Sequence, residues 1–358
     1  MSYRSGRPDL PPPVRYARNG GLSIAYQVLD GPGPDLVFVP GFVTHLDLAW
    51  EEPFLARFLR GLAGFSRLIW FDRRGTGLSD PTPAGLTLDD AIEDVRVVLR
   101  AAGSGPAVLF GVAVGAAICT AYALRHPADV RSLVLWAGHA RLLRAPGYPA
   151  GWSAEFLAGV LAGIDADWAQ GAGVATMNPS LAGDERYRAW FVRNARAAAS
   201  PAQARELFAL CAASDFRDDL AGISVPTLAV QRADDPWLSA EHSRYVAARI
   251  PEAELVVLPG ADHWPWIGDA DAVLAEIEAF LTGVRRGRRD RPAWGPEALT
   301  RREREVAALA VQGLSAAQIG ARLHISERTA ESHIAGAYRK LGVGSRVELV
   351  RRATEWGL

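Results

Sequence analysis

The sequence predicts two domains: an α/β domain with a doubly wound, mostly parallel sheet and a helical lid, followed by a small all-α domain of four helices. Three observations lead to this prediction. Short apolar runs alternate with helical patterns through residues 1–283, a helical stretch interrupts them at about 140–220, and four short helical segments occupy 297–358. Such alternation is typical of a sheet covered by helices on both faces. A chain of 358 residues is long enough for one large and one small domain.

Seven apolar runs are predicted as strands, because short, near-continuous apolar runs are typical of strands that are buried on both faces. They are residues 22–29, 36–39, 67–71, 107–111, 132–136, 226–230 and 254–258. Helices are expected between them at 88–101, 241–249 and 271–281. In the first of these helices, Ile92, Val95, Val98 and Leu99 share one face.

One uncharged run, residues 103–124, has the length of a membrane span, but glycines and Pro106 interrupt it. We therefore expect a buried strand, a tight turn and a buried helix there, and no membrane segment. The N-terminus has no apolar core of a signal peptide, which predicts a cytoplasmic protein. Two cysteines, Cys119 and Cys211, exclude a disulfide scaffold and a cysteine-based zinc site. We expect no metal and no cofactor.

The net charge of −1 hides an asymmetry between the two parts of the chain. Residues 284–358 contain fourteen arginines and Lys340 against eight acidic residues, which gives +7, whereas residues 1–283 carry −8. A basic tail on an acidic body favours a polyanionic partner for the tail, although a solvated basic surface has the same composition. Arginines, glycine and two prolines at 284–296 indicate a linker.

Three places in the first domain carry motifs of one enzyme family. The run 107–111 leads into Gly111-Val112-Ala113-Val114-Gly115, which is the nucleophile-elbow pattern G-x-S-x-G with alanine in place of serine. Asp234-Asp235 and then His263 follow the last two predicted strands, in the family's order of acid and histidine. With the segment 71–80, the joint pattern resembles the α/β-hydrolase fold over residues 14–283.

By this resemblance, Asp235 aligns with the triad acid and His263 with the triad base. The backbone N–H groups of Phe42 and Val114 would form the oxyanion hole. Pro40 stands where many members have histidine, and Ala116 where many have glycine.

Ala113 decides the predicted chemistry, because a methyl group cannot be deprotonated and forms no acyl-enzyme. Loss of such a serine costs about 10⁶-fold in a well-studied protease. Cys119 does not replace it, since it lies about 9 Å further along the next helix. The sequence therefore predicts a pseudo-hydrolase with vestigial triad positions Ala113, Asp235 and His263. Alternatives stay open: an enzyme that uses the His263–Asp235 pair without a nucleophile, an engineered Ser→Ala change, or a histidine kept only for the fold.

Tryptophans flank both the acid and the histidine, which indicates either an aromatic-lined pocket or plain core. The hypothesis is a pocket for a small, apolar, aromatic ligand. Its predicted ligand-binding residues are Phe42, Ala113, Val114, Trp237, His263, Trp264 and Trp266.

Residues 299–343 resemble the LuxR-type helix-turn-helix. The matching pieces include Leu299-Thr300, Gly313-Leu314-Ser315, Ile325-Ser326-Glu327-Arg328-Thr329 and Arg339-Lys340-Leu341-Gly342-Val343. Ala330 departs from the family, which usually has valine there. Thr300 with Glu303 is predicted to cap the first helix, and Ser315, Ser326 and Ser345 precede the other three.

The predicted recognition helix, 327–341, turns one stripe inward. This stripe consists of Ala330, Ile334, Ala337, Tyr338 and Leu341. On the opposite face, Glu331 and Ser332 are expected at base edges and Ala335 at a thymine methyl. The full set of predicted DNA-binding residues is Ser326, Arg328, Thr329, Glu331, Ser332, Ala335, Arg339 and Lys340.

Together these features predict a ligand-responsive transcriptional regulator that binds double-stranded DNA. By the resemblance, the last helix, 345–356, would join two copies of the protein into a homodimer; the alternative is that it only covers the core of the small domain. Two other classes stay open, an active enzyme tethered to DNA and a protein-interaction scaffold.

Overall fold

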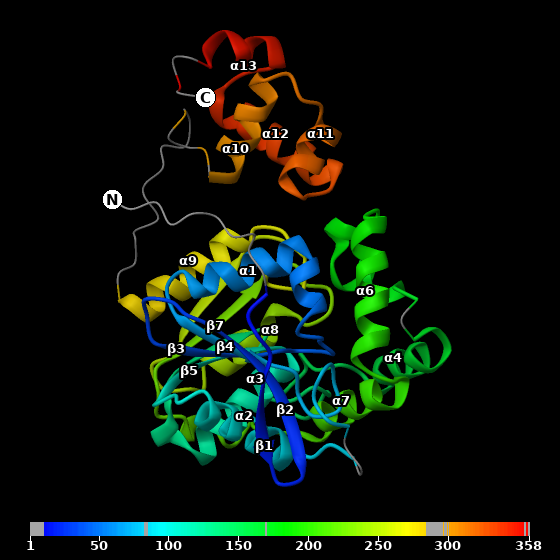
Figure 1. Cartoon of the computed structure of the whole chain (residues 1–358), viewed down its shortest axis with the longest axis vertical. Helices are drawn as coiled ribbons and strands as arrows, with labels where there is room; N and C mark the ends of the chain where they lie inside the picture. Colours follow the sequence, from blue (N-terminus) through cyan, green and yellow to red (C-terminus); the bar gives the residue numbers. More distant parts are fainter. Residues whose placement is uncertain are drawn as a thin grey trace. The chain divides into compact units, whose positions relative to one another are not determined.

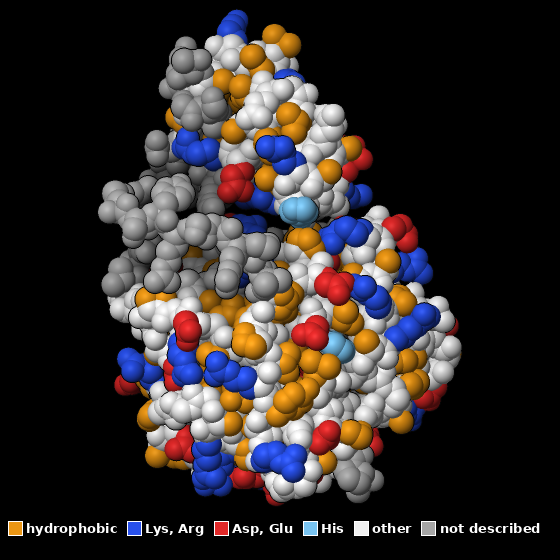
Figure 2. Space-filling model, in the orientation of Figure 1, with side chains coloured by type: hydrophobic (Ala, Val, Ile, Leu, Met, Phe, Trp, Pro, Cys, Tyr) orange, Lys and Arg blue, Asp and Glu red, His pale blue; other side chains and the backbone are white. Residues whose placement is uncertain are grey.

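The computed structural model describes residues 11–81, 85–168, 170–283, 296, 299, 301–353 and 356. Its internal contacts divide the chain into two compact units, Met1–Glu278 and Ala279–Leu358. Acidic, basic and apolar side chains are interspersed on the face of the first unit shown in Figure 2.

The first unit contains one sheet of eight strands in the order β1-β2-β4-β3-β5-β6-β7-β8. The strands are β1 (Arg15–Asn19), β2 (Leu22–Leu29), β3 (Asp35–Val39), β4 (Arg67–Phe71), β5 (Ala107–Val112), β6 (Val130–Trp136), β7 (Thr227–Arg232) and β8 (Glu254–Leu258). The pairs β1–β2 and β2–β4 are antiparallel, and all the others are parallel. The predicted mostly parallel sheet is confirmed, but β1 is an additional strand that the sequence analysis did not predict.

Helices cover both faces of the sheet (Figure 1). They are α1 (Pro53–Ala63), α2 (Leu88–Ala101), α3 (Val114–Arg125), α8 (Ala240–Ala247) and α9 (Ala270–Thr282). Helices α1 and α9 lie side by side, joined by an Arg57–Asp271 ion pair of 2.7 Å. Gly61 permits this approach, since a Cβ there would lie 2.4 Å from a methyl group of Leu274.

The uncharged run at 103–124 forms β5 and most of α3, and both elements are almost wholly buried. This agrees with the prediction of a strand, a turn and a buried helix. Among the described residues, no helix is long and apolar enough to cross a membrane.

The interruption of the strand–helix alternation is a lid of four helices between β6 and β7. They are α4 (Ala154–Asp167), α5 (Ala172–Met177), α6 (Glu185–Ala198) and α7 (Pro201–Ala213). The lid is attached to the body by Trp190, whose indole N–H donates to the Leu48 carbonyl at 2.8 Å. Arg186 adds an ion pair with the buried Glu52 at 3.0 Å.

The second unit contains the four predicted helices, α10 (Arg301–Val311), α11 (Ala316–Leu323), α12 (Glu327–Leu341) and α13 (Arg346–Arg352). Ser315 and Ser345 cap α11 and α13 as expected, and the Ser326 hydroxyl accepts from the Thr329 N–H at 3.0 Å. Thr300 and linker residues 284–295 lie outside the described residues. The predicted inward stripe of α12 is confirmed: its five members are in or against the apolar core of this unit.

Candidate functional site

Ala113 occupies a sharp turn between β5 and α3, with φ 49° and ψ −109°. This conformation is unfavourable for a residue with a Cβ and is held by its surroundings. The Ala113 N–H donates to the Trp136 carbonyl at 2.9 Å. A Cβ on Gly111 would lie 2.5 Å from the Gly115 oxygen, and one on Gly115 would lie 2.1 Å from the Val39 oxygen. The elbow geometry is therefore complete although its serine is absent.

The acid and the histidine meet above this turn. His263 Nδ1 lies 2.8 Å from Asp235 Oδ2, and both side chains are buried. The other carboxylate oxygen of Asp235 accepts from the N–H groups of Trp237 and Leu238 at 2.8 and 3.2 Å. Asp235 therefore orients the imidazole in the same way as the acid of an active triad orients its histidine. The neighbouring Asp234 is exposed and takes no part.

The loop after β3 carries the second predicted oxyanion donor, Phe42. Asp72 organises this loop, because its carboxylate accepts from the Leu46 and Leu78 N–H groups and from the Thr44 hydroxyl at 2.8–3.0 Å. Burial raises the pKa of Asp72 to about 7. No acceptor in the described part of the chain faces the N–H of Phe42 or of Val114. Both donors are free to hold a ligand oxygen.

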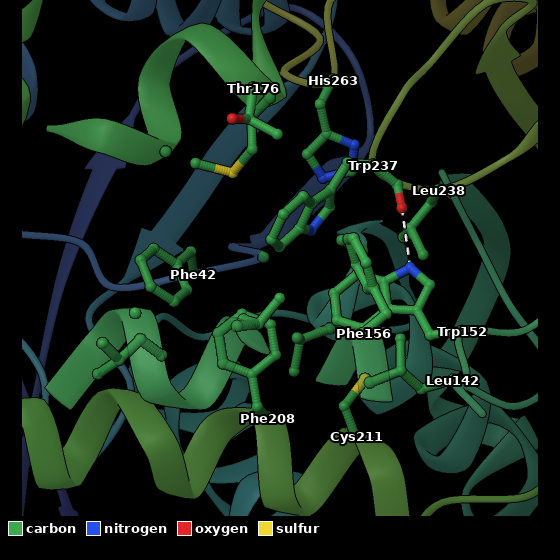
Figure 3. A pocket seen from close by; sticks show the side chains of 18 of the residues that line it. Phe42, Leu142, Trp152, Phe156, Thr176, Phe208, Cys211, Trp237, Leu238 and His263 are labelled. Carbon is green, nitrogen blue, oxygen red and sulfur yellow. Dashed lines mark hydrogen bonds between the residues drawn. The ribbon is translucent and has the colours of Figure 1, made fainter. Parts of the chain in front are cut away.

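A cavity of about 540 Å³ lies between Ala113 and the lid. Six of the seven predicted ligand-binding residues line it: Phe42, Ala113, Val114, Trp237, His263 and Trp264. Figure 3 shows Phe42, Trp237 and His263 around the cavity. The prediction for Trp266 is corrected, because this residue lies outside the cavity. Its ring stacks on that of Trp264, with a distance of 5.1 Å between the ring centroids.

Sequence analysis missed a thiol–imidazole pair in the same wall. Cys211, from α7, lies with its Sγ 3.0 Å from His139 Nε2, and both residues line the cavity. Burial raises the pKa of Cys211 to about 12 and lowers that of His139 to about 4. The pair is therefore a neutral thiol and a neutral imidazole at neutral pH. In the sequence, only the position of His139 shortly after a predicted strand pointed to this pair. No motif singled out Cys211 within the predicted lid.

The lid is bonded directly to the loop that carries His263. The His263 N–H donates to the Met177 carbonyl at 2.8 Å, and the Trp264 N–H donates to the Asn178 side-chain oxygen at 3.1 Å. The Ser180 N–H donates to the Asp262 carboxylate at 3.0 Å. These three hydrogen bonds couple the lid to the histidine loop.

In the second unit, Arg328, Glu331, Ser332 and Ala335 are exposed along α12. Ser326 and Thr329, two further predicted DNA contacts, are hydrogen-bonded to each other, with 2.7 Å between their hydroxyl oxygens. Lys340 Nζ forms a 2.7 Å ion pair with Glu303 of α10, a partner that the sequence did not reveal. The side chain of Arg339 lies outside the described residues. His324 occupies the turn before α12 in a left-handed conformation, φ 55°.

No group of three or more His, Cys, Asp or Glu within the described ranges could hold a metal ion.

Comparisons with known proteins agree with this geometry. The model of the alpha/beta hydrolase fold family matches residues 34–270, and that of the luxR family of bacterial regulatory proteins matches 297–353. The chain therefore belongs to the α/β hydrolase fold family. Its C-terminal unit matches the luxR family, so that the chain joins a LuxR-type domain to an α/β-hydrolase domain.

Individual relatives match one or the other unit. An AB hydrolase superfamily protein of Bacillus subtilis, YisY, is 28% identical over 70% of this chain and 92% of its own length. A crystal structure of a hydrolase from Pseudomonas aeruginosa has 28% identity and a TM-score of 0.63, and covers 75% of this chain and 98% of its own. A Mycobacterium bovis protein named as an HTH-type transcriptional regulator is 45% identical over 24% of this chain, which spans only 10% of that regulator.

Proposed function

We propose that residues 1–283 form a sensor that binds a small apolar molecule without cleaving it, and that binding changes the DNA affinity of residues 297–358 through the linker 284–296. The observation that carries this proposal is the 540 Å³ cavity directly above Ala113. A site that has lost its nucleophile and kept a large apolar cavity has the features of a binding pocket.

The remaining polar groups support binding rather than catalysis. His263 and the N–H groups of Phe42 and Val114 hold a carbonyl or hydroxyl oxygen at one end of the ligand. Aromatic walls from Trp237 and Trp264 contact its apolar body. With a methyl group at position 113, the bound carbonyl meets no attacking atom.

The alternative is an active enzyme tethered to DNA. The intact His263–Asp235 pair favours it, since the pair needs only a substrate proton to act as a base. Cys211 gives this alternative little support, because its thiol is protonated and its partner His139 is a weak base. We therefore keep the sensor as the proposed function.

The test uses the full chain and an operator selected from random duplex DNA. Operator affinity and tryptophan fluorescence are measured together during titration with a bacterial metabolite extract. We expect an extract fraction to shift both, and a tenfold change in operator affinity corresponds to about 1.4 kcal/mol of coupling. A fraction that alters the fluorescence but leaves operator affinity unchanged would contradict regulation by the ligand.

A further inference from the structure

We propose that the cavity selects an uncharged, extended molecule: a carbonyl group at the Ala113 end and an apolar chain that lies along α4. This inference rests on the proposed function as a ligand-binding domain. It goes further in naming the shape and the charge of the ligand.

The shape follows from the face that α4 turns to the cavity. Seven α4 residues line it, at intervals of one, three and four positions: Glu155, Phe156, Gly159, Val160, Gly163, Ile164 and Asp167. At a rise of 1.5 Å per residue, the twelve steps from Glu155 to Asp167 extend over about 18 Å. The cavity therefore follows a largely exposed face of the helix over about three turns. This suits an extended chain better than a single ring, in contrast to the aromatic ligand that the sequence predicts.

Two glycines widen the middle of this wall. A Cβ added to Gly159 or to Gly163 meets no atom within 4 Å. Neither glycine is required by backbone conformation, because both lie inside the helix with ordinary dihedral angles. Glycine is unfavourable within a helix, so its presence twice on the face that lines the cavity fits a need for open space there.

The carbonyl end is defined by backbone donors beside Ala113 that have no acceptor in the described part of the chain. These are the N–H groups of Phe42 and Val114, with His263 beside them. Two backbone donors that border the same cavity suit a carbonyl oxygen as the acceptor. Away from this end, the wall is made by apolar side chains such as Phe156, Phe208 and Leu142 (Figure 3).

The charge preference follows from the residues that line the cavity. Among the described residues that line it, none is lysine or arginine. The His263–Asp235 pair adds no net positive charge in either protonation state of the histidine. A carboxylate ligand would lose its hydration without gaining a cationic partner, which is costly in an apolar cavity. An ester, amide or ketone avoids this cost.

The experiment uses three probes on the full chain at neutral pH: methyl decanoate, decanoate and methyl butanoate. Binding is measured by tryptophan fluorescence, since four tryptophans line the cavity: Trp152, Trp168, Trp237 and Trp264. We expect methyl decanoate to bind at least tenfold more tightly than decanoate, and also more tightly than methyl butanoate. Decanoate that binds as well as its ester would overturn the charge preference while leaving the sensor proposal intact.

Variants of α4 test the position of the chain. Gly159→Leu and Gly163→Leu place side chains in the open groove and favour the helix, so the fold is retained. We expect either variant to lose at least tenfold in affinity for methyl decanoate while keeping its affinity for methyl butanoate. Ala162→Leu is the matched control, because Ala162 is exposed on α4 and does not line the cavity.

The possible results separate this inference from the proposed function. Equal losses in Ala162→Leu and Gly163→Leu, or no ester binding at millimolar concentration, would overturn the inference. Selective ester binding that the α4 variants abolish would support it. If such binding left operator affinity unchanged, the regulatory proposal would fail and the ligand class would stand.

Discussion

At the scale of single residues, Ala113 keeps a backbone conformation that serves a nucleophile it does not have. Such a conformation costs on the order of 1–3 kcal/mol. The packing around it is close, because Gly111 and Gly115 stand where a Cβ would clash with backbone atoms of Gly115 and Val39. The same rigidity keeps the N–H of Val114 at the start of α3, where it remains available to a ligand.

The first prediction concerns this residue. The natural chain should not hydrolyse p-nitrophenyl esters, whereas Ala113→Ser should show weak turnover, because His263, Asp235 and the backbone donors are in place. Release of p-nitrophenol measures the turnover of the natural chain and of the Ala113→Ser variant. The double variant Ala113→Ser with His263→Ala serves as the control. Turnover by the natural chain that disappears in His263→Ala or Cys211→Ala would show that another group performs the chemistry.

A second residue-scale prediction concerns His242, which is buried on α8 beside Tyr148. Burial lowers its pKa from 6.5 to about 3. The unfolded chain therefore binds a proton that the folded chain excludes, and stability falls as the pH drops from 6.5 toward 3, by up to about 1.4 kcal/mol per pH unit. In urea unfolding at several pH values, His242→Phe should lose less stability on acidification than the natural chain. Parallel curves for the two proteins would show that His242 does not titrate as buried histidine should.

At the scale of elements, the sequence analysis succeeded where a strand or helix has a strong apolar pattern. It missed β1 because Arg15–Asn19 is mostly polar and buries only Ala17, so that pairing with β2 rather than composition makes it a strand. Trp266 was misplaced for a related reason. Its position two residues after Trp264 could not show that its ring packs edge-on against Phe38 and away from the cavity.

Contacts between distant elements were also beyond the sequence. The pairing of Cys211 with His139 joins α7 to the loop after β6, and that of Lys340 with Glu303 joins α12 to α10. Neither pair has a spacing that a pattern could reveal, because each depends on how two helices or loops pack in space. The triad positions were predictable because a family motif marks Ala113, Asp235 and His263 individually.

The third prediction belongs to α12. Its exposed Glu331 and Ser332 are expected to contact base edges, so that Glu331→Gln or Ser332→Ala changes the preferred sequence, with about 1–3 kcal/mol at the affected base pair. Arg328→Ala should instead weaken all sequences and reduce the salt dependence of binding. Both effects are measured by binding of the full chain to a library of operator variants at several salt concentrations. An Arg328→Ala variant that alters sequence preference alone would contradict these assignments.

At the scale of the whole molecule, the two units differ in charge, with −8 on residues 1–283 and +7 on 284–358. The body therefore adds no attraction to DNA, and affinity depends on the number of basic domains that engage the duplex together. Not every arginine of the tail is available to DNA. Arg346, for example, donates hydrogen bonds to the carbonyls of Gly313 and Leu314 within the domain. Among the described side chains of α12, Arg328 is exposed and Lys340 is paired with Glu303. One exposed cation on this helix favours binding as a pair.

The fourth prediction follows from this need for two copies. Val347 and Val350 lie one turn apart on α13 and are 79% and 46% exposed, which leaves an apolar strip available to a second copy of the chain. We expect the full chain to bind two half-sites about one helical turn apart, and an insertion of half a turn between them to reduce affinity at least tenfold. Val347→Asp should abolish this dependence on spacing, because it places a charge within the strip, whereas a change at the exposed Arg351 should preserve it. Gel-shift titration with operators of different spacing measures the effect. Spacing dependence that survives in Val347→Asp would place the contact between the two copies elsewhere in the chain.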